Sequence, residues 1–212
     1  HYNSIGGAII NNTIASNSYS IRFNFESAGN IMYALSKATN IRKNSDGEYA
    51  ILGIPYAQYV KGEFDFSKNI RIDHRNSFAF HIGMGIAVPY GNAKTIPFEK
   101  QYFSGGANSV RGWTVRDLGP GSFVRDENTN LLDQSGDIKL DASIEYRSKL
   151  FWKFQGAIFV DAGNIWTIRD YDNQPGGVFK FDKFYKQIAV AYGLGLRLDL
   201  DFFILRFDGG MK

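Results

Sequence analysis

Side chains that commonly carry catalysis are scattered along the 212 residues in no catalytic arrangement. The three histidines, His1, His74 and His81, stand apart and form no H-E-x-x-H or other metal-ligand spacing. Ser104 and Ser109 lack the G-x-S-x-G context of an acyl-transfer nucleophile. The glycine-rich run "GGANSVRG" lacks the G-K-[ST] ending of a phosphate-binding loop. The sequence therefore predicts no enzymatic activity and no ATP site.

Metal, cofactor and nucleic-acid binding are equally unsupported. The chain has no cysteine, which excludes thiolate metal sites and disulfides. Four acidic residues, Asp126, Glu127, Asp133 and Asp137, could hold calcium only loosely, because they lack EF-hand spacing. A net charge of +3, from 24 basic and 21 acidic residues, is too small to indicate nucleic-acid binding. We expect no cofactor, no metal and no nucleic-acid partner.

The most elaborate polar stretch is "FSGGANSVRGWTVRDLGPG", residues 103–121. It holds five glycines, two arginines and a tryptophan, and it lies between two segments with the character of strands. Hairpin loops commonly have two to five residues, so this stretch is too long for a hairpin turn. Taken alone, Arg111 at its centre is most simply a solvated loop residue. A different role requires a partner elsewhere in the fold.

The elements that must position this stretch show a hydropathy period of two. Residues 137–150, "DIKLDASIEYRSKL", alternate polar and apolar side chains, the signature of a strand with one face of each kind. The same alternation marks "SYSIRFNFE", "FAFHIGMGIAVPY", "WKFQGAIFVDAGNIW" and "KQIAVAYGLGLRLDL", with weaker runs near residues 3–11, 62–73 and 202–211. About eight strands result, several of them roughly 12 to 15 residues long, whereas soluble strands usually have about five or six.

The length and polarity of these strands favour a transmembrane β-barrel. A tilted strand needs about 9 to 11 residues to cross the hydrocarbon core. The polar face of each run carries glycines, small residues and charges, which suit a water-filled lumen. Aromatic residues near strand ends, Tyr90, Tyr146, Trp152 and Trp166, fit interfacial girdles. Periodicity alone leaves a soluble up-and-down barrel or a β-sandwich as alternatives.

The connections between the strands alternate in length. Short ones are expected near residues 73–78, 147–151 and 199–202, and long ones at about 28–61, 91–136 and 167–185. In outer-membrane barrels the short turns are periplasmic and the long loops extracellular. The stretch "GNIMYALSKATN" in the first long loop is expected to form a helical turn.

Three motifs together resemble the BamA/TamA family of outer-membrane assembly proteins. "GGANSVRGW" followed by "LGPG" is similar to that family's V-R-G-aromatic loop signature, and "IFVDAGNIW" to its aromatic-x-Asp-x-Gly strand motif. "YGLGLRLDLDFFILRFDGGMK" resembles the strand pair that precedes the family's final strand. The resemblance spans nearly the whole chain and is strongest over residues 100–212.

The resemblance implies an all-β fold, a partial antiparallel transmembrane β-barrel in the bacterial outer membrane. Residues 1–212 would be the C-terminal part of one barrel domain, with about eight strands of a sixteen-stranded barrel. The final strand, the first strands and the periplasmic POTRA domains would lie outside this chain. The long loop 91–136 would fold back into the lumen.

The resemblance also suggests a role for the loop arginine. The motif residues Val110, Arg111, Gly112 and Trp113 would sit in the lumen, and Arg111 would meet acidic residues on the inner wall. Asp161 and Glu145 match the family's acidic partners, and both lie on the polar face of their strands by parity. Arginine can bind a carboxylate with two parallel hydrogen bonds, which lysine cannot reproduce.

Glycines are expected to support this arrangement. Gly105 and Gly106, like Gly112, permit tight backbone turns in the loop. Gly163, with Asn164 beside it, is expected to serve strand curvature or a bulge.

The function implied by the resemblance is folding and insertion of β-barrel clients into the outer membrane. In the family a client's edge strand pairs at a weak seam between the first and last strands. Partners would be the lipid bilayer, unfolded β-barrel clients, and periplasmic chaperones and accessory lipoproteins that act through the POTRA domains. Alternatives are a two-partner-type polypeptide secretion translocator and a barrel that anchors an upstream enzyme domain; a passive porin is disfavoured by the loop motif.

Overall fold

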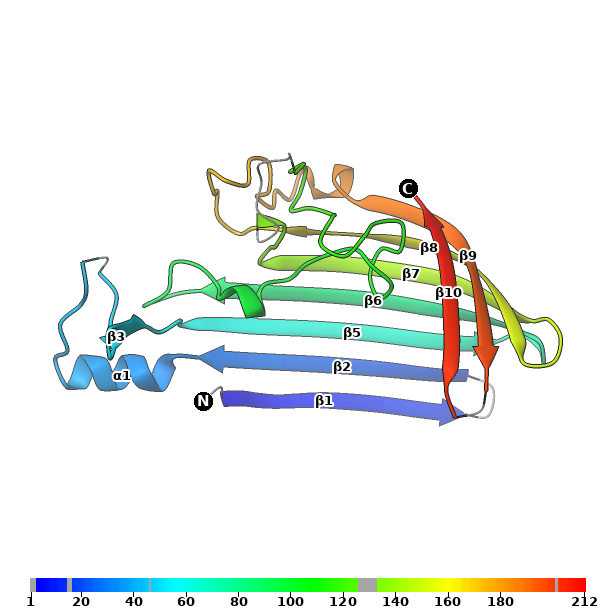
Figure 1. The fold of residues 1–212 in the computed structure, drawn as a ribbon. Coiled ribbons are helices and arrows are strands. Elements are labelled where there is room, and N and C mark those ends of the chain that lie inside the picture. Colours follow the sequence, from blue (N-terminus) through cyan, green and yellow to red (C-terminus); the bar gives the residue numbers. More distant parts are fainter. Residues whose placement is uncertain (1–2, 15–16, 46, 126–132, 201) are drawn as a thin grey trace.

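Eight long strands form one antiparallel sheet in the computed structural model, which describes residues 3–14, 17–45, 47–125, 133–200 and 202–212. Side chains are described from residue 17 onward. The strands are β1 (Asn3–Ile14), β2 (Asn17–Ala28), β5 (Tyr59–Arg71), β6 (Asn76–Pro89), β7 (Ile138–Lys149), β8 (Phe154–Trp166), β9 (Ala189–Asp199) and β10 (Ile204–Met211). Each pairs with the next in this order as an up-and-down meander (Figure 1). The predicted all-β class and strand pattern are confirmed.

Strand register runs evenly through the centre of the sheet. The ladders from β2 to β10 pair residue by residue, and the one shift lies between β1 and β2, at Ser4 and Gly7. Gly163 pairs with Asp141 of β7 and with Ala189 of β9 in this regular ladder. Of the two roles expected for Gly163 and Asn164, strand curvature or a bulge, the bulge is therefore not formed.

The connections differ at the two ends of the sheet, as expected. Residues 72–75 and 150–153 make short turns at one end, and there the Leu200 N–H donates to the Phe203 carbonyl between β9 and β10. The long connections at the other end contain the helix α1 (Asn30–Ala38), the small hairpin β3 (Ala50–Ile51) and β4 (Ile54–Pro55), and the 3-10 turns η1 (Phe98–Lys100) and η3 (Phe184–Lys186). The helical turn predicted in the first long loop corresponds to α1. No helix in the described ranges is long and apolar enough to cross a membrane.

Apolar side chains remain exposed on one face of the sheet. Met84 and Ile86 in β6 are 46% and 47% exposed, and Leu194 at the middle of β9 is 66% exposed. Besides the large sheet, the described residues form only the two-stranded β3–β4 hairpin. Within the described residues, therefore, no second large sheet covers this face as it would in a β-sandwich. Exposed alternate apolar residues along strands of this length are what a lipid-facing surface requires.

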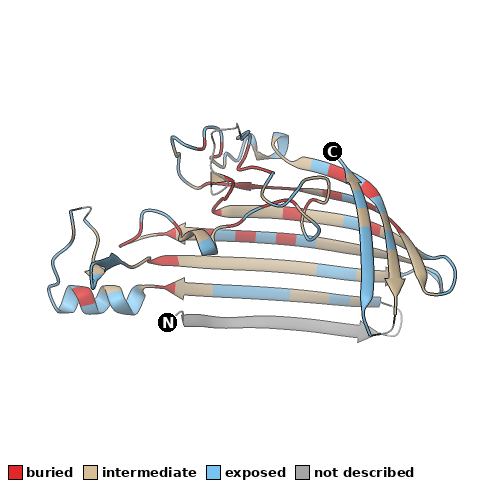
Figure 2. Ribbon diagram, in the orientation of Figure 1, coloured by how far each residue is buried: buried red, intermediate tan, exposed pale blue. Residues whose placement is uncertain are grey.

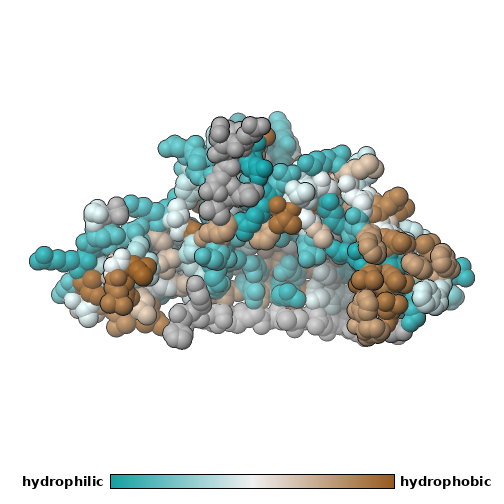
Figure 3. All heavy atoms as spheres, in the orientation of Figure 1, coloured by the Kyte–Doolittle hydropathy of each residue, from teal (hydrophilic) through white to brown (hydrophobic). Residues whose placement is uncertain are grey.

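The opposite, concave face is polar and partly buried. The sheet curls so that β9 and β10 turn over it, and the connection between β6 and β7 lies across it (Figure 1). Its surface is largely hydrophilic in Figure 3, while the buried residues in Figure 2 gather beneath the long connection. Lys100 in that connection reaches Glu26 of β2 at 2.7 Å, and Lys61 of β5 lies over the ring of Tyr102. The loop thus contacts the inner wall from β2 to β10.

We predict that a charge on the outer face will be far more costly than one on the inner face. Leu194→Arg places a guanidinium in hydrocarbon near the middle of a strand, which costs about 2–4 kcal/mol at the bilayer midplane. The matched control is Ser67→Arg, because Ser67 faces the polar interior, where it contacts His81. Denaturant unfolding of the full protein in phospholipid vesicles measures both. Equal destabilisation by the two substitutions would contradict the assignment of the faces.

Candidate functional site

The loop that contains Arg111 is a compact hairpin closed by its own backbone. Ser104 and Leu118 form a β-bridge, and the Gly106 N–H donates to the Trp113 carbonyl at 2.8 Å. Gly105 and Gly106 have φ values of 96° and 87°, in the region that favours glycine. A Cβ at Gly105 would lie 2.1 Å from the Thr114 carbonyl oxygen. These glycines let the hairpin close and present its tip, residues 110–113, to the sheet.

The tip is packed against β9 and β10. Val110 is fully buried in a cluster with Leu118 and Ala191, and Trp113 packs against that cluster. A Cβ on Gly112 would lie 2.7 Å from the Ala191 Cβ and 2.9 Å from the Met211 carbonyl oxygen. Glycine at this position therefore allows the loop backbone to touch both strands, and the motif spacing brings Arg111 to the inner wall.

Arg111 is bound by two carboxylates on adjacent strands. Its Nε and Nη2 donate to the two oxygens of Asp161 at 2.7 and 2.8 Å, a bidentate arrangement, and its backbone N–H donates to Asp161 Oδ2 at 3.1 Å. Its Nη1 donates to Glu145 Oε2 at 2.8 Å. The exposed fractions of these side chains are 6% for Arg111, 0% for Asp161 and 6% for Glu145. The structure thus brings together all three residues that the sequence selected.

Two further contacts of Arg111 were not predicted. Asp208 of β10 lies 3.4 Å from its Nη1, and the ring centroid of Phe159 lies 3.4 Å from its Cζ, so the guanidinium stacks on an aromatic face. Phe159 is 1% exposed. A large aromatic at a polar-face position of its strand was the available signal for Phe159. Asp208 lies in the weaker run at 202–211, where parity alone gave no reason to choose it.

The carboxylates around the loop arginine are shared with other arginines. Glu145 also accepts a hydrogen bond from Arg147 Nε at 2.8 Å and one from Arg197. Asp208 pairs with Arg206 at 2.9 Å. Burying charges is costly, and the cost is offset only where every charge finds a partner of opposite sign. The cluster therefore holds together as a network of opposite charges, which loses much of its stability when one member is removed.

The protonation of Arg111 is set by these partners. Burial opposes the charged guanidinium, but the hydrogen bonds that Arg111 donates to Asp161 and Glu145 outweigh it and hold the pKa of Arg111 above its ordinary value. The guanidinium itself therefore stays charged throughout the ordinary pH range. An exposed ion pair contributes about 0–1 kcal/mol, whereas breaking a buried pair by removing one partner costs about 3–5 kcal/mol. The arrangement can act as a strong tether between loop and wall.

Gly163 and Asn164 have structural roles that differ from the expected bulge. A Cβ on Gly163 would lie 2.7 Å from the Leu140 carbonyl oxygen, so glycine permits close approach of β7 and β8. Asn164 is 1% exposed, and its Nδ2 donates to the carbonyls of Gly121 and Gln187. This amide joins the second and third long connections at the end of β8. Sequence reasoning missed the bridge because it depends on where the loops run.

Several polar residues that were considered for catalysis or metal binding contact other protein side chains. Ser104 and Ser109 contact each other at 3.2 Å, and His81 pairs with Asp141 at 3.2 Å. Among the described residues no three His, Cys, Asp or Glu side chains are grouped to hold a metal ion. His1, Asp126 and Glu127 lie outside the described residues.

The two described acidic residues of the calcium candidate bind protein groups. Asp133 accepts from Asn173 at 2.6 Å, and Asp137 accepts from the Ile168 N–H at 3.0 Å. Burial raises the pKa of the Asp137 carboxyl above its ordinary value, although the Ile168 hydrogen bond and the charge of Arg169 oppose the shift. Asp133 and Asp137 therefore stabilise the packing of the long connections.

Comparison with known proteins agrees with the fold and the loop. The family model described as the Omp85 superfamily domain matches residues 11–212. The chain belongs to the Omp85 superfamily. This places the sheet in an outer-membrane β-barrel and confirms the family resemblance drawn from the three motifs.

Two relatives show how far the likeness of this Omp85 chain extends. It is 35% identical over 99 residues to the outer membrane protein assembly factor BamA of Neisseria meningitidis serogroup B, a match that covers 42% of the chain and 12% of that protein. The crystal structure of BamA from Haemophilus ducreyi lacking POTRA domains 1–3 covers 93% of the chain with a TM-score of 0.55 and 17% identity. The chain spans 48% of that structure, which is similar in fold.

We predict that Arg111→Ala will release the loop, because Asp161 and Glu145 then remain buried without their shared partner. The expected cost is about 3–5 kcal/mol of loop docking. Hydrogen exchange of the amides of residues 104–118, in the full protein in bilayers, measures it. The control is Arg125→Ala, because Arg125 is exposed in the same connection. If exchange in the two variants is equally slow, Arg111 does not hold the loop.

We also predict that Gly112→Ala will prevent close docking of the loop tip. The added methyl group would overlap the Ala191 side chain and the Met211 carbonyl, and overpacking of this kind costs about 1–3 kcal/mol. Gly209→Ala is the control, since the nearest atom to a Cβ there is 4.0 Å away. The same exchange experiment should show faster exchange for Gly112→Ala alone. Unchanged protection would mean that the docked tip can accommodate a methyl group at position 112.

Proposed function

We propose that the chain forms part of an outer-membrane assembly factor that folds β-barrel clients and inserts them into the membrane. The observation that carries the proposal is the buried contact of Arg111 with Asp161 and Glu145. The 35% identity to a protein named as an assembly factor supports it as well. In this proposal the loop over residues 91–136 is folded into the lumen of one barrel, of which residues 1–212 are the C-terminal part.

The geometry suggests what these strands contribute. Arg111 joins β7, β8 and β10 through Glu145, Asp161 and Asp208, so three strands and the loop form one rigid unit. A client can add a strand to a barrel edge only where two strands of the barrel separate, while the rest of the barrel stays rigid. We propose that the three strands and the docked loop form this rigid part of the barrel. Client strands, periplasmic chaperones and accessory lipoproteins would engage other parts of the full protein, including its POTRA domains.

The work of insertion in this proposal comes from strand pairing. A client's edge strand has unpaired N–H and C=O groups, each of which costs several kcal/mol in hydrocarbon. A wall that keeps its shape lets an adjacent seam open without loss of the whole barrel. The docked loop supplies that stiffness, because undocking it would break the buried ion pairs of Arg111 with Asp161 and Glu145.

The test is client folding by the full protein reconstituted in vesicles. Arg111→Ala should leave the barrel inserted but slow the folding of a small β-barrel client, measured by heat modifiability on gels, by about tenfold, within the range of coupling energies between sites. Exchanging the charges in Arg111→Asp with Asp161→Arg should partly restore the rate, because the pair is re-formed in reverse.

Other outcomes would separate the alternatives. The proposed role of the tether would be contradicted if the Arg111→Ala variant folded the client as fast as the unaltered protein does while its loop was shown to be undocked. Passage of a soluble polypeptide across the vesicle membrane, without folding of barrel clients, would identify a secretion translocator instead.

A further inference from the structure

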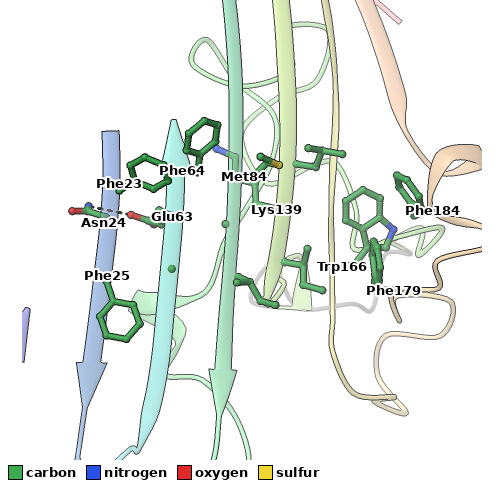
Figure 4. Close-up of a pocket in the computed structure, with 15 residues that line it drawn as sticks. Phe23, Asn24, Phe25, Glu63, Phe64, Met84, Lys139, Trp166, Phe179 and Phe184 are labelled. Atoms are coloured by element: carbon green, nitrogen blue, oxygen red, sulfur yellow. Dashed lines mark hydrogen bonds between the residues drawn. The ribbon is translucent and has the colours of Figure 1, made fainter. Parts of the chain in front are cut away.

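The lipid-facing side of the sheet contains a hollow of about 550 Å³ with apolar walls. Its floor is formed by Gly62, Met84 and Ile86 in β5 and β6, with β7 beside them. Phe25 stands at one side and Phe184 at the other, as Figure 4 shows. A hollow on a surface that faces lipid is a place where acyl chains can be held.

The missing side chain at position 62 adds space to the hollow. Gly62 pairs with Phe25 of β2 and with Ile86 of β6, two large outward-facing residues. A Cβ built on Gly62 would have no atom within 4 Å, so packing within the sheet does not require a glycine there. The gap between the large neighbours is therefore left open to the bilayer.

The hollow lies at the end of the strands that carries the long connections. Gly62 is near the start of β5 at Tyr59, and Phe25 and Ile86 are near the ends of β2 at Ala28 and β6 at Pro89. Long connections are extracellular in outer-membrane barrels. A lipid that entered the hollow would therefore come from the outer leaflet.

Lysines lie next to wall residues of the hollow in the chain. The connection between β8 and β9 contains "FKFDKFYK", residues 179–186, which holds four aromatic residues and three lysines. Phe179 and Phe184 wall the hollow and stack at 5.5 Å, and Lys180 and Lys183 are their immediate neighbours in the chain. These lysines and Lys186 are exposed, and within the described residues no carboxylate pairs with them.

We propose that this surface binds a phosphorylated, multiply acylated glycolipid of the outer leaflet. Its acyl chains lie in the hollow and its phosphates contact Lys180, Lys183 and Lys186. An ammonium group binds phosphate as a point charge, and Asp182 is the one acidic residue among the three lysines. The hollow reaches from β2 to β8, four strand spacings or about 19 Å, a breadth suited to several chains side by side.

Native mass spectrometry of the full protein in detergent tests the proposal, with lipid A carrying both phosphates as the probe. The triple variant Lys180→Gln, Lys183→Gln, Lys186→Gln should bind it at least about tenfold more weakly, since each basic residue near a charged membrane surface contributes measurably. A control variant removes the same charge from other long connections: Lys37→Gln, Lys43→Gln, Lys94→Gln. It should retain the affinity of the unaltered protein.

The hollow itself is tested by filling it. Gly62→Leu should weaken lipid A binding without unfolding the barrel, because open space surrounds that position. Gly209→Leu is the matched control: Gly209 pairs with the outward-facing Leu194 of β9, outside the hollow, and its Cβ would also be uncrowded.

Three results would overturn the proposal. They are equal binding of dephosphorylated lipid A, equal binding of two-chain phosphatidylglycerol, and equal losses in the variants and their controls. Weaker binding confined to the Lys180 triple variant and Gly62→Leu would support it. Neither outcome depends on client folding, so the test is independent of the proposed assembly function.

Discussion

The described architecture depends on one interaction, the pairing of the buried Arg111 guanidinium with carboxylates of the sheet. A charge removed from water must be matched by opposite charges and by hydrogen bonds, and Asp161, Glu145 and Asp208 supply them from three different strands. The flat fork of arginine satisfies Asp161 with two bonds while its face rests on Phe159. The glycines of the loop and the small side chain of Ala191 are there because the backbone must come close enough to deliver this group.

A second constraint comes from the two solvents on either side of the sheet. Lipid on one face and water or a folded loop on the other invert the usual relation between polarity and burial. Asp141 and Glu145 are buried, while Met84 and Leu194 are exposed. The same constraint permits Gly62: in a soluble core an empty position of this kind would be a destabilising cavity, but here the membrane can fill it.

Much of the fold follows from the sequence because alternation of side chains along a strand is a local property. Parity placed Asp161 and Glu145 on the inner face before any register was known, and the resemblance selected them as partners of Arg111. Asp208 and Phe159 were missed because their contact depends on how β10 pairs with β9 and on the path of the loop. The bridge made by Asn164 was missed for the same reason. Gly163 was expected to serve strand curvature or a bulge, and its absent side chain serves close packing against Asp141.

The position of Asp208 makes the docked loop a check on completed strand pairing. Asp208 lies opposite Gly195, and a slip of β10 by two residues would keep every side chain on its own face yet displace that carboxylate by about 7 Å along the strand. The hydropathy pattern alone would tolerate such an error. The three-carboxylate cradle would not, because it closes only when β7, β8 and β10 are mutually aligned. Docking against all three carboxylates therefore requires that these strands are already paired in the correct register.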